Sequence, residues 1–248
     1  MQRHCLIAVL VIATVVTLTT PAFARRLVPT LPADIPAGVR ARLAAVTDDA
    51  ALKTRIEGKS FVSRRDIFEY LLDHPEFATH VTRALKVARY RIWRTSSGLM
   101  LDDGWGAVGA LEVVHKAPGM RVMYLKGQYQ HSILPNIRGQ AVVTVEWTTT
   151  PAPAGKDVVV PTVGAYVKLD SRMLSAASGL ASSVASAKAE KEANRLVRVF
   201  EKTTRALEEN PGAVLEALRQ RADTPRRELD EFSRLLLGAP SASSAPAR

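Results

Sequence analysis

The middle of the chain alternates apolar and polar residues with a period of two. The segments RGQAVVTVEW and VGAYVKLD each keep their apolar residues on one side. Such alternation is typical of antiparallel strands with one buried face. WGAVGALEVVHK and MRVMYLKGQYQH are also strand-like, and Ala117-Pro118-Gly119 between them is a turn signal. We therefore expect four or more successive strands that form a meander.

Two short helices are predicted ahead of these strands. Ser63-Arg64-Arg65-Asp66 fits a capping box and precedes an apolar helical face. Asp73-His74-Pro75-Glu76 repeats the device, with Asp73 as the cap and Pro75 in the first turn of a second helix that runs to about Lys86. A further short helix is expected over Val39 to Leu52.

The period becomes helical again after the strands. Ala193, Leu196, Phe200, Thr203 and Leu207 step by three and four residues, which predicts a long amphipathic helix. Asn210-Pro211-Gly212 ends it, and two shorter helices are expected over 213–221 and 225–237. The Ala/Ser-rich run from Ser175 to Ala187 is interpreted as helix that either lines a cavity or only packs closely.

The two ends of the chain carry different signals. Residues 1–24 have a positive start, an apolar run and a small-x-small cleavage pattern at 22–24, which predicts a secretory signal peptide. Residues 25–51 form an extended leader and short helix, 52–209 the main domain and 210–237 a helical extension. The tail, 238–248, is small, polar and rich in proline, so we expect it to be disordered.

The cysteine content and the net charge limit the kinds of site and partner that we expect. Cys5 leaves with the signal peptide, so the mature chain has no cysteine for disulfides, thiolate metal sites or nucleophiles. The net charge of +10 favours anionic partners. For an exported and probably periplasmic protein these are lipid headgroups rather than nucleic acid, and simple solubility explains the charge equally well.

The order of these elements resembles the START-like, or SRPBCC, superfamily. The segment FVSRRDIFEYLLDHPEFATHV looks like its opening, and the helix from Ala193 to Leu207 after VGAYVKLD looks like its closing helix. The resemblance implies an α+β helix-grip fold, in which two short helices precede a curved antiparallel sheet packed on a long C-terminal helix. The helices after Pro211 depart from that pattern. Members are similar in having a deep apolar cavity between sheet and helix, used by carriers of lipids and by some cyclases or hydrolases.

We therefore expect a binding or carrier protein for an apolar or amphipathic small molecule such as a lipid. A lipid chain that buries on the order of 300 Å² at about 25 cal/mol per Å² gains about 7.5 kcal/mol before association costs, without any polar motif. The cavity wall, chosen from periodicity, is predicted to consist of Met123, Leu125, Val143, Val145, Trp147, Val163, Val167, Leu196 and Phe200.

Two other classes of function remain open. One is a cyclase or hydrolase on the same fold, with a cavity histidine or acid such as His115 or Glu112; His131 also ends a strand-like segment. The other is an envelope interaction protein without a ligand cavity. Its working surface would be the run RALKVARYRIWR, where aromatic residues separate Arg83, Lys86, Arg89, Arg91 and Arg94. Such a run suits an anionic membrane surface, and an ordinary solvated face explains it as well.

Metal and cofactor chemistry finds little support in the sequence. His74 and His80 are six residues apart, about 120° out of register on a helix, and Glu76 with His80 gives two ligands where zinc needs three or four. The stretch DDGWG lacks the acids of a calcium loop and fits a hairpin turn instead. We expect no metal and no cofactor, since nucleophile-elbow, HExxH, P-loop and Rossmann patterns are absent from the sequence.

Overall fold

The computed structural model describes residues 31–130, 136–170 and 180–238. The predicted signal peptide, His131, the start of the Ala/Ser-rich run and the predicted tail after Gly238 lie outside the described residues.

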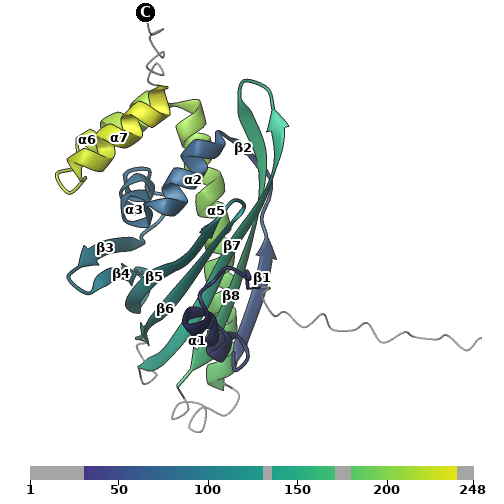
Figure 1. Ribbon diagram of the computed structural model, residues 1–248. Helices are drawn as coiled ribbons and strands as arrows, with labels where there is room; N and C mark the ends of the chain where they lie inside the picture. Colours follow the sequence, from purple (N-terminus) through teal and green to yellow (C-terminus); the bar gives the residue numbers. More distant parts are fainter. Residues whose placement is uncertain (1–30, 131–135, 171–179, 239–248) are drawn as a thin grey trace, which may run out of the picture.

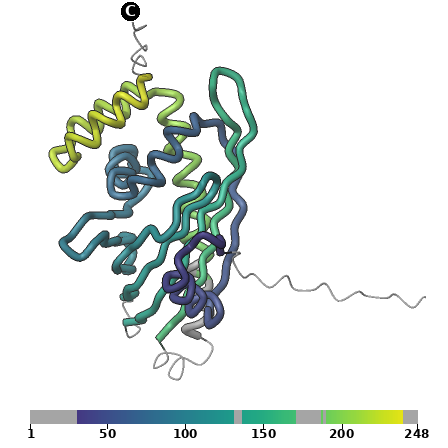
Figure 2. The backbone as a smooth tube through the Cα atoms, in the orientation of Figure 1, coloured from purple at the N-terminus to yellow at the C-terminus, as the bar shows by residue number. Residues whose placement is uncertain are grey.

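The fold is α+β and is built on one large antiparallel sheet (Figure 1). The strand order is β1-β8-β7-β6-β5-β4-β3, and β2 also pairs with β8, so the predicted meander is confirmed and extends from β3 to β8. The β7–β8 hairpin is the longest and projects beyond its neighbours (Figure 2). The strands are β1 Leu52–Glu57, β2 Phe61–Ser63, β3 Arg91–Thr95, β4 Gly98–Asp102, β5 Ala107–Ala117, β6 Met120–Tyr129, β7 Ile137–Ala152 and β8 Lys156–Leu169.

Helices cover both faces of the sheet. α1 lies on one face over β7 and β8, whereas the long α5 runs along the other face against β1, β2 and β8 (Figure 1). Among the described residues, no helix is both long and apolar enough to cross a lipid bilayer. The helices are α1 Ala37–Thr47, α2 Arg65–Asp73, α3 Pro75–Ala84, α5 Leu180–Glu209, α6 Pro211–Arg219 and α7 Arg226–Leu237.

The α2–α3 corner forms, but not through the predicted caps. Ser63 lies in β2, and its hydroxyl donates to the carbonyl of Arg64 instead of accepting from the helix. The α3 N-cap is His74, which makes no side-chain cap bond, and the Asp73 carboxylate binds Arg121 and Lys116 instead. A buried arginine competes better for a carboxylate than a helix end does, because it offers a full charge and two N–H donors, whereas a helix N-terminus carries about half a charge.

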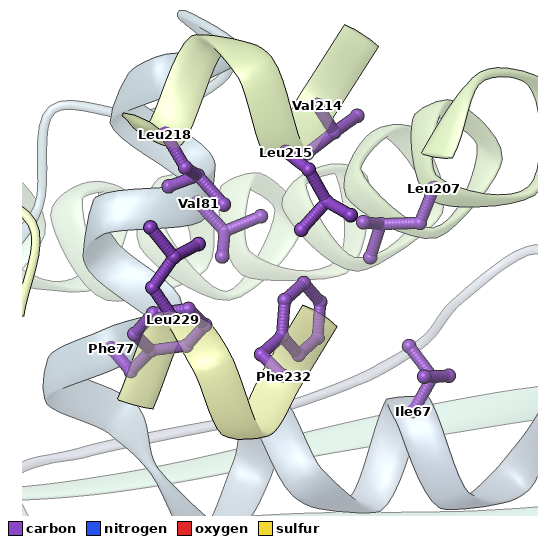
Figure 3. Close-up of a cluster of buried hydrophobic side chains, with 9 residues drawn as sticks. All are labelled: Ile67, Phe77, Val81, Leu207, Val214, Leu215, Leu218, Leu229 and Phe232. Atoms are coloured by element: carbon purple, nitrogen blue, oxygen red, sulfur yellow. The ribbon is translucent and has the colours of Figure 1, made fainter. Parts of the chain in front are cut away.

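The helices at the C-terminal end share a core with the α2–α3 corner. Phe77 of α3 packs against Phe232 of α7 at 5.2 Å between ring centroids. Figure 3 shows apolar side chains from α2, α3, α5, α6 and α7 meeting in this cluster. The extension after Pro211 therefore anchors the two short helices that precede the sheet.

Part of the outer face of the sheet, on β6, β7 and β8, is buried under α1. Val122, Val142 and Tyr166, which alternate with inward-facing residues, are at most 1% exposed and pack against Leu43 and Val46 of α1. The period of two predicts which residues share a face, but not that a helix from the leader covers the face opposite α5.

Candidate functional site

An apolar cavity of about 440 Å³ lies between the inner face of the sheet and the helices α2, α3 and α5. Seven of the nine residues predicted for its wall line it, contributed by β6, β7, β8 and α5. They are Met123, Leu125, Val143, Val163, Val167, Leu196 and Phe200.

The other two predicted wall residues, Val145 and Trp147, lie on the same face of β7 but outside the cavity lining, so this part of the prediction is wrong. Phe68 of α2 fills the space in front of them, with its ring 5.4 Å from that of Trp147 and nearly perpendicular to it. Phe61 and Phe200 pack on the same Phe68 ring at 5.6 and 5.7 Å. This aromatic cluster closes one end of the cavity.

A row of three glycines leaves room at the centre of the cavity. Gly109, Gly127 and Gly139 are paired in register across β5, β6 and β7, and all three line the cavity. A Cβ atom on Gly127 would lie 2.3 Å from the carbonyl oxygen of Val108, and one on Gly109 would lie 2.5 Å from that of Lys126. The strands approach so closely here that side chains are excluded, and the inner face remains open.

The sequence does carry a signal for this row. Glycine inside a strand often marks a close backbone approach, and each of the three interrupts a strand-like segment. Their alignment depends on the strand register, which a single sequence does not specify.

The opposite wall of the cavity comes from the helical corner. Leu71 and Leu72 of α2 and Ala78, Thr79 and Thr82 of α3 line it. The sequence predicts an apolar helical face here, but no part for it in the cavity wall. In fact that face divides between the cavity and the core shared with α6 and α7.

A hydrogen-bonded polar group lies at the largely apolar lining, which also includes Asp103, Lys126, Gln128, Arg138 and Gln140. Tyr90 donates a hydrogen bond of 2.9 Å to Glu192 of α5, whose other carboxylate oxygen accepts from Arg195 at 2.5 Å. The Arg195 guanidinium lies 3.5 Å from the ring centroid of Trp105. Burial, and then the charge of Glu192, raise the pKa of the Tyr90 phenol well above its ordinary value. Tyr90 therefore stays protonated and is a donor rather than a base.

The residues proposed for an enzyme lie outside the cavity lining. Glu112 pairs at 2.7 Å with Arg42 of α1, and the His115 ring nitrogen Nδ1 lies 3.9 Å from the carboxylate of Asp34, which precedes α1. The expected role of Glu112 or His115 inside the cavity is therefore wrong. Both belong to the α1 side of the sheet. Glu112 alternates with the cavity residue Leu111, and a β-bulge between Val113 and His115 turns His115 to the same outer face.

His74, Glu76 and His80, the histidines and acid considered above as metal ligands, each have a different partner in the structure. His74 stacks on Tyr70 with ring centroids 4.1 Å apart, Glu76 pairs with Arg94 of β3, and His80 lies beside Asp223. In the described part of the chain, no group of three or more His, Cys, Asp or Glu side chains could hold a metal ion.

The predicted basic run divides between ion pairs and an open cleft. Arg94 is paired with Glu76, whereas the other four cations line the cleft together with Ala88 and Arg221. We call this set, Arg83, Lys86, Ala88, Arg89, Arg91 and Arg221, the basic cleft. Arg221, which follows α6, was not predicted from the sequence, because 138 residues separate it from Arg83.

Comparison with known proteins gives limited results. No protein-family model matches the chain, and no curated protein matches it. Among solved structures, truncated norcoclaurine synthase from Thalictrum flavum is similar with a TM-score of 0.29 and 15% sequence identity. That match covers 47% of this chain and 77% of the other.

Proposed function

We propose that the protein is an exported, periplasmic carrier of the START-like, helix-grip type that holds an apolar or amphipathic molecule, such as a lipid, in the cavity beneath its sheet. The observation that carries the proposal is an apolar cavity of about 440 Å³ between the sheet and the helices, partly open to solvent. This volume falls in the ~300–1,000 Å³ range of small-molecule sites.

The energetics of the cavity favour an occupant. The cavity is partly open to solvent, and its wall is almost wholly apolar. A lipid chain that leaves water for this wall and buries on the order of 300 Å² gains about 7.5 kcal/mol before association costs.

The chemistry of the lining supports a carrier over an enzyme. No histidine is among the described residues that line the cavity. Tyr90 is held protonated by burial and by Glu192, and Glu192 is bonded to Arg195. Because Tyr90 gives its one phenol proton to Glu192, its oxygen is suited to accepting a hydrogen bond from a polar end of a ligand rather than to taking a proton from it.

Export is supported by the signal-peptide pattern of residues 1–24. The helix-grip assignment is supported by the antiparallel meander and by α5 lying along its inner face.

The test is to purify the protein from a native-like envelope, extract it with organic solvent and identify the extract by mass spectrometry. We expect one class of apolar molecule in near-stoichiometric amount. Ala165→Phe places a ring on the inner face of β8, within the cavity lining, and should prevent binding of a fluorescent fatty acid analogue. Ala110→Phe is the matched control, since Ala110 is exposed on β5 and outside the lining.

An extract without lipid, together with no uptake of the analogue from vesicles by the wild type, would refute the carrier. Equal binding by the Ala165→Phe and Ala110→Phe proteins would place the ligand elsewhere.

A further inference from the structure

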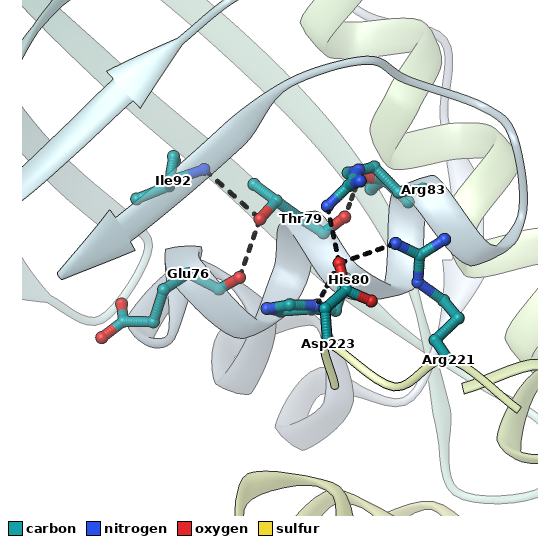
Figure 4. A network of polar contacts seen from close by, with 8 residues as sticks. Glu76, Thr79, His80, Arg83, Ile92, Arg221 and Asp223 are labelled. Atoms are coloured by element: carbon teal, nitrogen blue, oxygen red, sulfur yellow. Dashed lines mark hydrogen bonds and ion pairs between the residues drawn. The ribbon is translucent and has the colours of Figure 1, made fainter. Parts of the chain in front are cut away.

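The basic cleft has more positive charge than its own contacts neutralise. Five cationic side chains line it, and Asp223 pairs with two of them, Arg83 at 3.1 Å and Arg221 at 2.9 Å (Figure 4). For Lys86, Arg89 and Arg91, no ion pair is present among the described residues. All three are exposed.

The C-terminal ends of two helices offset part of this positive charge. Arg83 lies in the last turn of α3, and Arg221 follows the end of α6. A helix C-terminus carries about half a negative charge, so two of them offset about one cation. With Asp223, about two of the five cations are balanced, and about three remain for an external anion.

The strand beside the cleft connects it to the cavity. Tyr90 and Ile92 line the cavity, whereas the alternating residues Arg89 and Arg91 line the basic cleft. Trp93, the next residue of that alternation, is 36% exposed, and the guanidinium of Arg91 lies 5.6 Å from its ring centroid. Because β3 is the edge strand of the sheet, only one layer of backbone separates the cationic surface from the apolar interior.

We propose that the basic cleft docks the protein on a bilayer that contains anionic phospholipids, by binding their phosphate headgroups. Lysine and arginine supply the charge, and an exposed tryptophan beside them suits the apolar–polar boundary of a membrane. The purpose of docking rests on the proposed function: the carrier meets the membrane along the edge strand that also forms a wall of its cavity.

The test measures co-sedimentation with phosphatidylcholine vesicles, with and without phosphatidylglycerol. The cleft variant is Lys86→Gln, Arg89→Gln, Arg91→Gln. The control variant is Lys59→Gln, Arg198→Gln, Lys202→Gln, which removes the same charge at exposed positions outside the cleft lining. Each cation at an anionic surface contributes about 1 kcal/mol, which is about fivefold in affinity. The cleft variant should therefore bind anionic vesicles about a hundredfold more weakly, while the control keeps most of its affinity.

Tryptophan fluorescence reports on the same contact. Emission of the wild type should shift to shorter wavelength when anionic vesicles are added, and Trp93→Phe should remove the shift. Equal losses in the cleft and control variants would show attraction by net charge alone and would overturn the proposal. Equal binding to neutral vesicles, or full displacement by inorganic phosphate at the same phosphate concentration, would also overturn it.

The test of membrane docking can fail or succeed independently of the test of the carrier proposal. If the cleft variant binds the fatty acid analogue in solution but not vesicles, both proposals hold. If the wild type binds anionic vesicles through the cleft but no ligand enters the cavity, docking stands and the carrier fails.

Discussion

Asp73 connects the helical corner to the sheet through an ion pair, and replacing it by asparagine tests that role. Arg121 of β6 donates from Nε to Asp73 Oδ1 at 2.8 Å and from Nη2 to Oδ2 at 3.1 Å. The side chain of Arg121 is only 6% exposed, whereas that of Asp73 is 30% exposed. Arg121 also donates to the carbonyls of Ala117 and Met120.

The expected cost follows from what the substitution leaves behind. Breaking a fully buried pair costs about 3–5 kcal/mol, but Asp73 is partly exposed and asparagine keeps one acceptor. Of two hydrogen bonds to the charged Arg121, at about 1.5–3 kcal/mol each, one is lost. We therefore expect Asp73→Asn to lower the free energy of unfolding by about 2 kcal/mol.

This substitution distinguishes a role of Asp73 in the ion pair from a role as a helix cap. Asparagine caps a helix as well as aspartate does, so a capping role predicts almost no change. The assay is urea unfolding followed by far-ultraviolet circular dichroism, with the midpoint compared at an unchanged slope. Glu76→Gln is the control, three residues away. Because its partner Arg94 is 67% exposed, that ion pair contributes at most about 1 kcal/mol. An Asp73→Asn protein as stable as the wild type would refute the ion-pair account.

Two further predictions follow from the same geometry. Burial raises the pKa of Asp73, but the hydrogen bonds and charges of Arg121 and Lys116 outweigh it, so the pKa lies below its ordinary value. The stability that Asp73 adds is therefore present above the unfolded pKa of about 3.9 and is lost as pH falls through the folded pKa. The free energies of unfolding of the wild type and of Asp73→Asn should therefore converge in that acidic range. A difference between them that stays constant with pH would contradict this. Gly127→Ala should cost about 2–3 kcal/mol, because the added methyl group meets backbone that does not yield. Gly38→Ala in α1, with nothing within 4 Å, should instead stabilise by about 0.5–1 kcal/mol, and similar effects at both sites would contradict the close strand approach.

The predictions that succeeded depend on local periodicity. Val143, Val163 and Val167 were assigned to the inner face because a strand alternates sides with every residue. Asn210-Pro211-Gly212 predicts the end of the long helix, and α5 does end at Glu209. The next helix begins at Pro211, two residues before the predicted start, and the Asn210 side chain caps it by accepting from the backbone amide of Ala213. Patterns of this kind need only a few neighbouring residues.

The predictions that failed depend on partners distant in sequence. Asp73 has the residue type and position of a cap, yet Arg121, 48 residues away, binds it. Trp147 has the alternation of a cavity residue, yet Phe68 of α2 covers it. In each case the local pattern is real, and a tertiary contact that one sequence does not specify decides the outcome.

The cavity results from how the helices are placed, rather than from a deficit of apolar residues. α5 packs on β1, β2 and β8 at one side of the sheet, and α3 packs on β3 at the other edge. The strands between them pass beneath the open space, where the glycine row removes the side chains that would fill it. At these three registered positions the backbone excludes a Cβ atom. No single substitution there both fills the cavity and keeps the strand spacing, so the volume is a property of the fold itself.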